Sequence, residues 1–194
     1  MKIFRKLYNW TLEKSKSKQA PWFLSIVSFA ESSFFPIPPD IILIPMVIAN
    51  KTKAIYYASI CTISSVFGGA LGYVFGLLLF NSVGIIIINF YGLSENINDF
   101  SNYYNDYGAW IVLIAGFTPF PFKVITIASG LFQLNFMIFI IYSLVSRGAR
   151  FFIIASLLYF FGEKIKIFID KYFNVLTTIF IILLFISITF VKFI

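Results

Sequence analysis

Apolar residues gather into long runs along most of the chain, and short polar segments separate these runs. Each run exceeds the roughly 20 residues that a helix needs to cross the hydrocarbon core of a bilayer. Apolar runs of this length predict helices embedded in a membrane rather than strands. The runs cover residues 21–49, 54–80, 108–134, 136–162 and 173–193.

Prolines interrupt the first and third runs near their middles. Pro36, Pro38 and Pro39 interrupt the first run, and Pro119 and Pro121 interrupt the third. Proline lacks a backbone donor and clashes with the preceding helical turn, so closely spaced prolines end a helix. We therefore expect each of these runs to form two shorter helices, with the prolines at the tip between them.

The charges of the polar segments indicate how the broken runs sit in the membrane. Lysines are concentrated in three polar segments: residues 1–20, the short segment with Lys51 and Lys53, and residues 164–171. The segment 93–107 contains acidic residues and no Lys or Arg. Lysine and arginine are enriched on the cytoplasmic side of membrane proteins. All the basic segments lie on the cytoplasmic side if each broken run enters the membrane and leaves it again on the side from which it entered. The pattern favours re-entrant hairpins, a cytoplasmic N-terminus and an external loop at 93–107.

The same prolines mark an internal repeat. With this topology one hairpin enters from inside and the other from outside, which is the inverted repeat typical of secondary transporters. We therefore predict an all-α integral membrane protein with two inverted repeats, each a re-entrant helical hairpin plus a transmembrane helix, and an additional C-terminal transmembrane helix. The equivalent positions are Pro36 and Pro119, Pro38 and Pro121, and Asp40 and Lys123.

Composition restricts the class of protein further. Of the 194 residues 60% are hydrophobic and 12% are charged, whereas a soluble domain carries about 25% charged residues. The net charge of +7 and the basic, amphipathic segment 1–20 indicate contact with anionic lipid, and no nucleic-acid-binding motif accompanies them. One cysteine and no histidine exclude disulfide frameworks and histidine-based catalytic or zinc sites. We predict no metal, no cofactor and no enzymatic activity.

Five ionisable residues lie within the predicted membrane segments. Each costs about 2.5–3.5 kcal/mol at the centre of a membrane helix, so they must pair with one another or line a polar cavity. Without histidine, only a carboxylate could carry a transported proton, which makes the two acids candidate proton carriers. The three cations are candidate ligands of a phosphate-bearing substrate. The alternative is that all five only form ion pairs that hold the hairpins together. The residues are Glu31, Asp40, Lys123, Arg147 and Arg150.

Small residues recur at every fourth position of the second run. Ser64, Gly68, Gly72 and Gly76 form a ridge on one helix face. Such ridges let another helix approach closely, so we interpret this one as a packing surface. Whether copies of the chain associate into a homo-oligomer stays open.

The motifs ESSFFPIPPD, GFTPFPFKVITIASG and RGAR together resemble the DedA family, also called the VTT or SNARE-associated Golgi-protein superfamily. Its shorter YqaA-like branch is most similar, and the likeness extends over most of 21–162. The resemblance implies two re-entrant hairpins and the movement of undecaprenyl phosphate or phospholipid across the bacterial inner membrane with proton coupling. The family's acidic positions match Glu31 and Asp40, and its arginine pair matches Arg147 and Arg150.

The second broken run departs from the family's commoner pattern, F-x-R-F-x-P-x-x-R. Gly116 stands at the first arginine position, and Phe122 stands at the second, with Lys123 one residue later. The expected function is that of a flippase or transporter for an anionic lipid, with membrane lipids and protons as partners. The competing interpretation is a membrane-organising or envelope-homeostasis protein that transports nothing. An intramembrane enzyme ranks lower, because only Asp40 among the aspartates lies within a predicted membrane segment.

Overall fold

The computed structural model describes residues 19–35, 38–79, 94–118, 120–162 and 164, and these residues contain helices but no strand. The predicted N-terminal segment and C-terminal helix at 173–193 lie outside this part of the chain, apart from residues 19 and 20. The elements are α2 (Ala20–Ser33), α3 (Asp40–Ala49), the short 3-10 helix η1 (Lys51–Lys53), α4 (Ala54–Leu79), α6 (Ser94–Phe117), α7 (Phe122–Leu131) and a helix at Phe136–Gly162.

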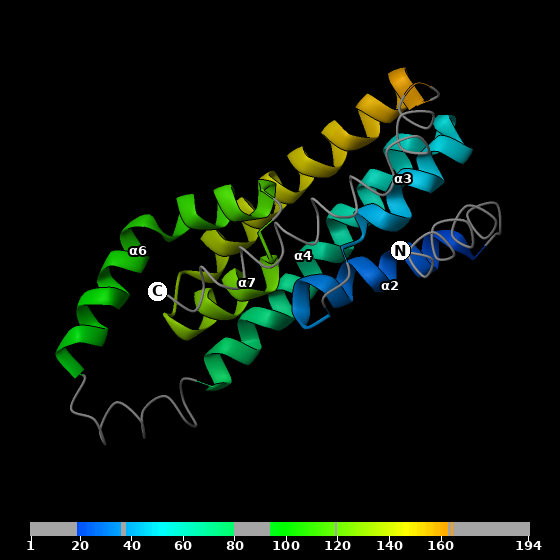
Figure 1. The fold of residues 1–194 in the computed structure, drawn as a ribbon. Helices are drawn as coiled ribbons and strands as arrows, with labels where there is room; N and C mark the ends of the chain where they lie inside the picture. Colours follow the sequence, from blue (N-terminus) through cyan, green and yellow to red (C-terminus); the bar gives the residue numbers. More distant parts are fainter. Residues whose placement is uncertain (1–18, 36–37, 80–93, 119, 163, 165–194) are drawn as a thin grey trace, which may run out of the picture.

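The first broken run forms two helices, as the prolines predict. Helix α2 ends at Ser33, and Pro39 is the N-cap of α3. The chain turns back between them, so α2 and α3 run in opposite directions (Figure 1). Hydroxyl groups attach α2 to α4: Ser28 donates to the carbonyl of Cys61, and Ser33 donates to that of Gly68, both at 2.8 Å.

The second broken run divides in the same way. Helix α6 ends at Phe117, Pro121 is the N-cap of α7, and the chain again turns back (Figure 1). One expectation was wrong: the segment 93–107, expected to be a loop, is helical from Ser94 onward. Residues 94–107 contain neither proline nor glycine. The helix therefore continues through a polar stretch whose charges alone suggested a loop.

Two long helices form the centre of the molecule and run antiparallel. Gly162 lies against Lys51 at one end, and the rings of Tyr73 and Phe136 pack together at the other, with centroids 5.2 Å apart. In Figure 1 the helix Phe136–Gly162, coloured yellow to orange, runs beside α4 over much of its length. By length and composition, both Lys51–Leu79 and Phe136–Gly162 are candidate membrane spans.

The apolar core is divided into two clusters, one at each end of these long helices. The first contains Leu24 of α2, Leu43 of α3, Ala58 of α4 and Phe151. The second joins residues of α6 and α7, including Val112 and Ile125, to the C-terminal half of α4 and the start of the helix Phe136–Gly162. Each broken run thus packs at its own end, and the tips of both lie between the two clusters.

The glycine ridge of α4 is a packing surface. A Cβ atom at Gly68 would lie 2.1 Å from the carbonyl oxygen of Phe29, and one at Gly76 would lie 2.0 Å from that of Ile127. The glycines therefore let the backbones of α2 and α7 contact the backbone of α4. Lipid chains are as apolar as the helices, so the hydrophobic effect does not drive membrane helices together. Close packing of this kind stabilises their association instead.

We expect Gly76→Ala to lower the free energy of unfolding by about 1–3 kcal/mol, because an overpacked site must shift backbone atoms. Gly148→Ala is the matched control, since among the described residues its Cβ would meet only the Cγ2 atom of Thr62, at 3.6 Å. Alanine there should instead stabilise the helix by up to about 1 kcal/mol. Thermal unfolding in detergent measures both. Equal stability of the two variants would contradict the close contact between α4 and α7.

Large apolar side chains cover the outside of the molecule. Trp22, Phe67 and Phe160 are 74%, 66% and 72% exposed, and many other aromatic and aliphatic residues share this position. A surface this apolar is suited to the hydrocarbon interior of a bilayer and not to water. Several polar side chains of the apolar runs are buried inside instead, among them Ser28, Ser32, Ser65 and Arg147.

Candidate functional site

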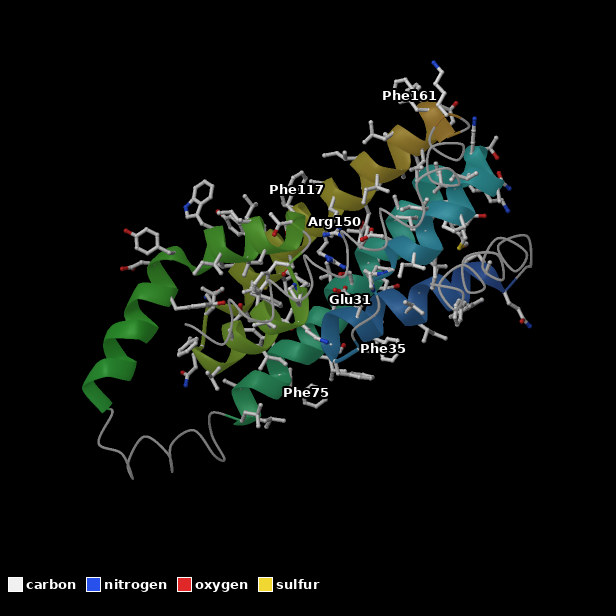
Figure 2. The ribbon with its side chains drawn as sticks, viewed as in Figure 1. Glu31, Phe35, Phe75, Phe117, Arg150 and Phe161 are labelled. Atoms are coloured by element: carbon white, nitrogen blue, oxygen red, sulfur yellow. The ribbon has the colours of Figure 1, made fainter. Side chains whose placement is uncertain are left out.

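A layer of charged and hydroxyl side chains separates the two apolar clusters. Arg147 and Arg150 contribute to it from the middle of the helix Phe136–Gly162, and Glu31 and Asp40 contribute from the two sides of the first break. Figure 2 shows Glu31 and Arg150 in the interior, where helices from both broken runs come together. The acids and arginines predicted from the sequence therefore do meet.

Glu31 and Arg147 belong to a closed ring of hydrogen bonds. Arg147 donates from Nη2 to Glu31 Oε2 at 2.6 Å and from Nε to Ser65 Oγ at 2.7 Å. Ser32 Oγ donates to the same carboxylate oxygen at 3.1 Å and shares a 2.6 Å hydrogen bond with Ser65 Oγ. Because Ser32 uses its only proton on Glu31, Ser65 must be the donor between the serines. The ring joins α2, α4 and the helix Phe136–Gly162.

This ring is enclosed by aromatic side chains. The guanidinium of Arg147 lies 5.0 Å from the ring centre of Phe122 and 4.7 Å from that of Phe151, within the range of cation–π attraction. The side chains of Arg147 and Glu31 are only 2% and 11% exposed. A pair removed from solvent in this way depends almost entirely on its own partners.

Arg150 connects the two broken runs directly. Its Nη2 donates to Asp40 Oδ2 at the start of α3, and its Nη1 donates to the backbone carbonyl of Thr118 at 2.6 Å. Thr118 follows α6, at the tip of the second broken run. One guanidinium therefore holds both tips, and at least one of these two hydrogen bonds must break if the tips are to separate.

The Asp40–Arg150 pair leaves hydrogen-bonding capacity unused. Within the described part of the chain, Asp40 Oδ1 and Arg150 Nε are buried and have no hydrogen-bond partner. Both side chains are 16% exposed, more than those of the Glu31–Arg147 pair. An arginine can bind a carboxylate or a phosphate through two parallel hydrogen bonds, and here only one joins it to the acid. Of the two ion pairs, Asp40–Arg150 is therefore the one in which another anion could more readily replace the carboxylate.

Lys123 does not join this layer, although it was predicted together with Arg147 and Arg150 as a substrate ligand. Among the described residues, no carboxylate lies within ion-pair distance of it. It lies in the first turn of α7, where the helix dipole is unfavourable for a cation. Each of the two ion pairs is neutral, so the excess positive charge of the five predicted ionisable residues is that of Lys123.

The predicted tip prolines are placed in part. Pro39 and Pro121 cap α3 and α7, and Pro38 immediately precedes the first of these caps. Pro36 and Pro119 lie outside the described residues. With prolines at the caps, the new helices start at Asp40 and Phe122, which brings an acid of one run and an aromatic residue of the other to the arginines.

Sequence reasoning missed the hydroxyl partners of this layer. Ser32 and Ser65 complete the ring around Glu31, and Thr126 of α7 donates to the carbonyl of Ser32 at 3.1 Å. The available signal was the presence of Ser and Thr within the apolar runs, since such residues often form hydrogen bonds between membrane helices. That signal does not say which residues pair.

Comparison with known families identifies the fold family. The model of the VTT domain matches residues 37–160, which contain Asp40, Lys123 and both arginines. The chain belongs to the VTT domain family. Its membership of this group, also named DedA, confirms the resemblance carried by the proline and arginine motifs. Together with the apolar outer surface, it makes the chain a membrane protein.

Relatives of this VTT protein occur in bacteria and archaea. An uncharacterized protein of Haemophilus influenzae is 40% identical over 164 residues, covering 84% of this chain and 85% of the relative. One of Histophilus somni is 37% identical over 168 residues, again covering 84% and 85%. A third, from Methanocaldococcus jannaschii, is 29% identical over 125 residues, or 64% of this chain and 75% of the relative. No solved structure matches the chain.

The structure explains the residues found at the two positions of the second broken run where the resemblance predicts arginine. A Cβ atom at Gly116 would lie 2.2 Å from Ser146 Oγ. No larger side chain fits there while the helices keep this packing. At the other position the fully buried Phe122 lies beside the guanidinium of Arg147. Packing therefore takes the place of both cations.

Proposed function

We propose that this VTT protein moves an anionic lipid, a polyprenyl phosphate or a phospholipid, across the bacterial inner membrane. The single observation that carries the proposal is the position of Arg150, which binds an acid of one broken run and the tip of the other. A phosphate that competes for Arg150 would release this connection. Membership of the VTT family and the apolar outer surface support a site that lies within a membrane.

We further propose that the two broken runs are re-entrant hairpins related as an inverted repeat. In support, each run turns back at its prolines, and the two runs pack in opposite halves of an antiparallel helix pair. Backbone that is not helical is tolerated at membrane depth only inside protein or beside water. The buried polar layer gives both tips such surroundings.

Asp40 is the better candidate for proton coupling in this mechanism. When a phosphate binds Arg150, Asp40 loses its cation and becomes an unpaired, partly buried carboxylate. Protonation of Asp40 would remove that charge, so lipid binding and proton uptake would occur together. Glu31 keeps Arg147 and Ser32 throughout, which assigns it a structural role in the proposal.

The transport proposal is tested by reconstituting the full chain into liposomes with labelled polyprenyl phosphate or phosphatidylglycerol. We expect the label to cross between leaflets faster than in protein-free liposomes, and faster with a pH gradient. Empty liposomes and liposomes with Asp40→Asn protein control for leakage. Lipid movement at the protein-free rate for both lipids would refute transport.

The ring around Glu31 favours a second candidate, a membrane-organising protein that transports nothing. A polar layer whose only role is to hold two hairpins together would be fully paired, as Glu31 and Arg147 are. The liposome experiment separates the two candidates, since the second predicts no protein-dependent lipid movement. Loss of envelope integrity in cells that carry only Arg147→Ala protein would then support it.

We predict that the N-terminus, Lys51 and Lys171 face the cytoplasm while Asp99 faces outward. Single cysteines introduced at these positions in a Cys61→Ser background can be labelled from either side of the membrane. Cys61 is itself fully buried, so its replacement should alter little of the surface. Labelling of Lys51→Cys from outside only would contradict the re-entrant topology.

A further inference from the structure

A pocket of about 580 Å³ lies outside the ion-pair layer, between the end of α2, α4 and α7. Its lining is apolar except at Ser33 and Lys123, and it opens onto the apolar outer surface of the molecule, where Phe34 and Phe75 are 64% and 43% exposed. The volume lies within the range of ligand-binding pockets. The other lining residues are Leu78, Leu79, Val124 and Ile127.

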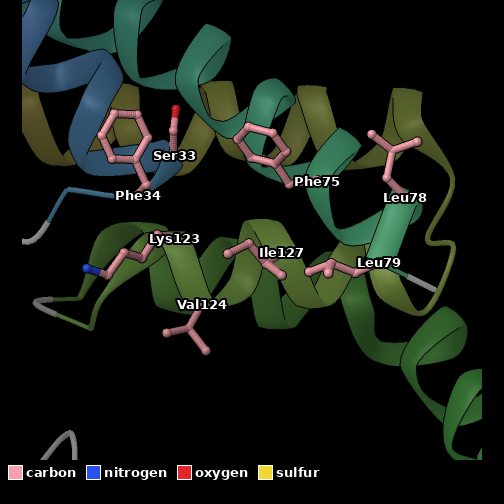
Figure 3. Close-up of a pocket in the computed structure, with 8 residues that line it drawn as sticks. All are labelled: Ser33, Phe34, Phe75, Leu78, Leu79, Lys123, Val124 and Ile127. Atoms are coloured by element: carbon pink, nitrogen blue, oxygen red, sulfur yellow. The ribbon is translucent and has the colours of Figure 1, made fainter. Parts of the chain in front are cut away.

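The pocket has a charged end and an apolar end. Figure 3 shows Lys123 at one end, beside Phe34, and Leu78 and Leu79 at the opposite end, with Ile127 and Phe75 between them. A phospholipid has the same division, with a phosphate at one end and hydrocarbon chains at the other. The pocket therefore matches an amphiphile better than a small free anion, which would leave the apolar end unfilled.

The charge of Lys123 indicates the sign of the headgroup. Its counterpart in the repeat is Asp40, which is paired with Arg150, whereas no acid among the described residues pairs with Lys123. The N-terminal end of the α7 dipole adds further positive potential beside it. A cation at membrane depth requires a partner or water, and an anionic group in the pocket would supply the partner.

We propose that this pocket binds a membrane lipid with a net-negative phosphate headgroup, with Lys123 holding the phosphate and Phe75, Leu79 and Ile127 contacting the hydrocarbon chain. The inference rests on the proposed function and deepens it. It assigns the transported lipid a binding site that is separate from Arg150.

The test is native mass spectrometry of the intact protein with phosphatidylglycerol and phosphatidylcholine of identical acyl chains. The wild-type protein should retain phosphatidylglycerol in preference, and Lys123→Ala should reduce that retention about tenfold, the change expected when one charge-assisted hydrogen bond is lost. Lys123→Arg should keep the preference. The matched control is Lys53→Ala, which removes one positive charge from an exposed position.

Filling the pocket tests the hydrocarbon contact. Ile127→Trp should reduce the retention of both lipids, and Phe75→Trp serves as a second variant if the first unfolds at a lower temperature than the wild type. Equal retention of phosphatidylglycerol by the Lys123→Ala and Lys53→Ala proteins would overturn the proposal. So would displacement of the lipid by millimolar inorganic phosphate, because the site would then bind the free anion.

The outcome is independent of transport. An Arg150→Ala protein should still retain phosphatidylglycerol through Lys123 even if it moves no lipid in liposomes. Binding as expected without transport by the wild-type protein would refute the proposed function and leave the pocket assignment in place. Transport by the wild-type protein with no effect of Lys123→Ala on binding would refute the pocket assignment alone.

Discussion

Arg147→Ala is expected to lower the free energy of unfolding by about 3–5 kcal/mol, because removal of one member of a buried ion pair leaves the other charge without compensation. Of its partners among the described residues, Glu31 would keep only Ser32, and Ser65 would lose the donor Arg147 Nε. Arg147 also fills space between Phe122 and Phe151, so truncation adds a cavity. Thermal or denaturant unfolding in detergent micelles measures the loss.

Two further variants separate the charge from the packing. Glu31→Gln keeps the shape of the side chain, and we expect it to cost about 1–3 kcal/mol of stability because one charge-assisted hydrogen bond weakens. The double variant Glu31→Leu with Arg147→Met removes both charges at once. It should be more stable than the summed losses of the Glu31→Leu and Arg147→Met single variants predict. Strictly additive losses would contradict a coupled pair.

Glu31→Gln also distinguishes the roles of the two acids. If Glu31 is structural, as the ring indicates, this variant should be less stable and its residual transport should keep its dependence on a pH gradient. A stable Glu31→Gln protein whose transport no longer responds to the gradient would make Glu31 the proton carrier and displace Asp40 from that role.

Arg150→Ala is expected to reduce lipid transport in liposomes by about 10- to 100-fold, the range that corresponds to the loss of one or more hydrogen bonds to a charged group. The variant removes the proposed phosphate ligand and also the contact that joins Asp40 to the Thr118 carbonyl. Its loss of stability should be smaller than that of Arg147→Ala, because the Asp40–Arg150 pair is more exposed.

Arg150→Lys and Lys53→Ala complete this experiment. Lysine keeps the charge at position 150 but cannot offer two parallel donors, so transport should be intermediate. Lys53 is exposed at the end of the 3-10 helix η1, so the Lys53→Ala variant should leave transport unchanged. Full transport activity in the Arg150→Ala protein would exclude Arg150 as the phosphate ligand.

The sequence by itself determined where the helices are and where they break. Long apolar runs and prolines are local signals, and they predicted the ends of α2, α4 and the helix Phe136–Gly162 closely. It also located the five charged residues of the apolar runs, since an ionisable residue within such a run must be paired or hydrated wherever its partner lies. The first part of α6 was predicted as a loop, because that prediction relied on the acidic charges of the segment and not on its helix propensity.

Only the tertiary structure decided which charges pair and which charge remains. Arg147 and Arg150 are three residues apart on one helix, and nothing local tells which of them meets Glu31. The position of α2 along α4 settles it, because Ser32 and Ser65 then lie beside Arg147, while the turn at the prolines brings Asp40 to Arg150. Lys123 has the same spacing from its prolines as Asp40, yet it faces an apolar pocket instead of an acid. Pairing depends on contacts between segments more than a hundred residues apart, and such contacts are set by packing and not by local sequence.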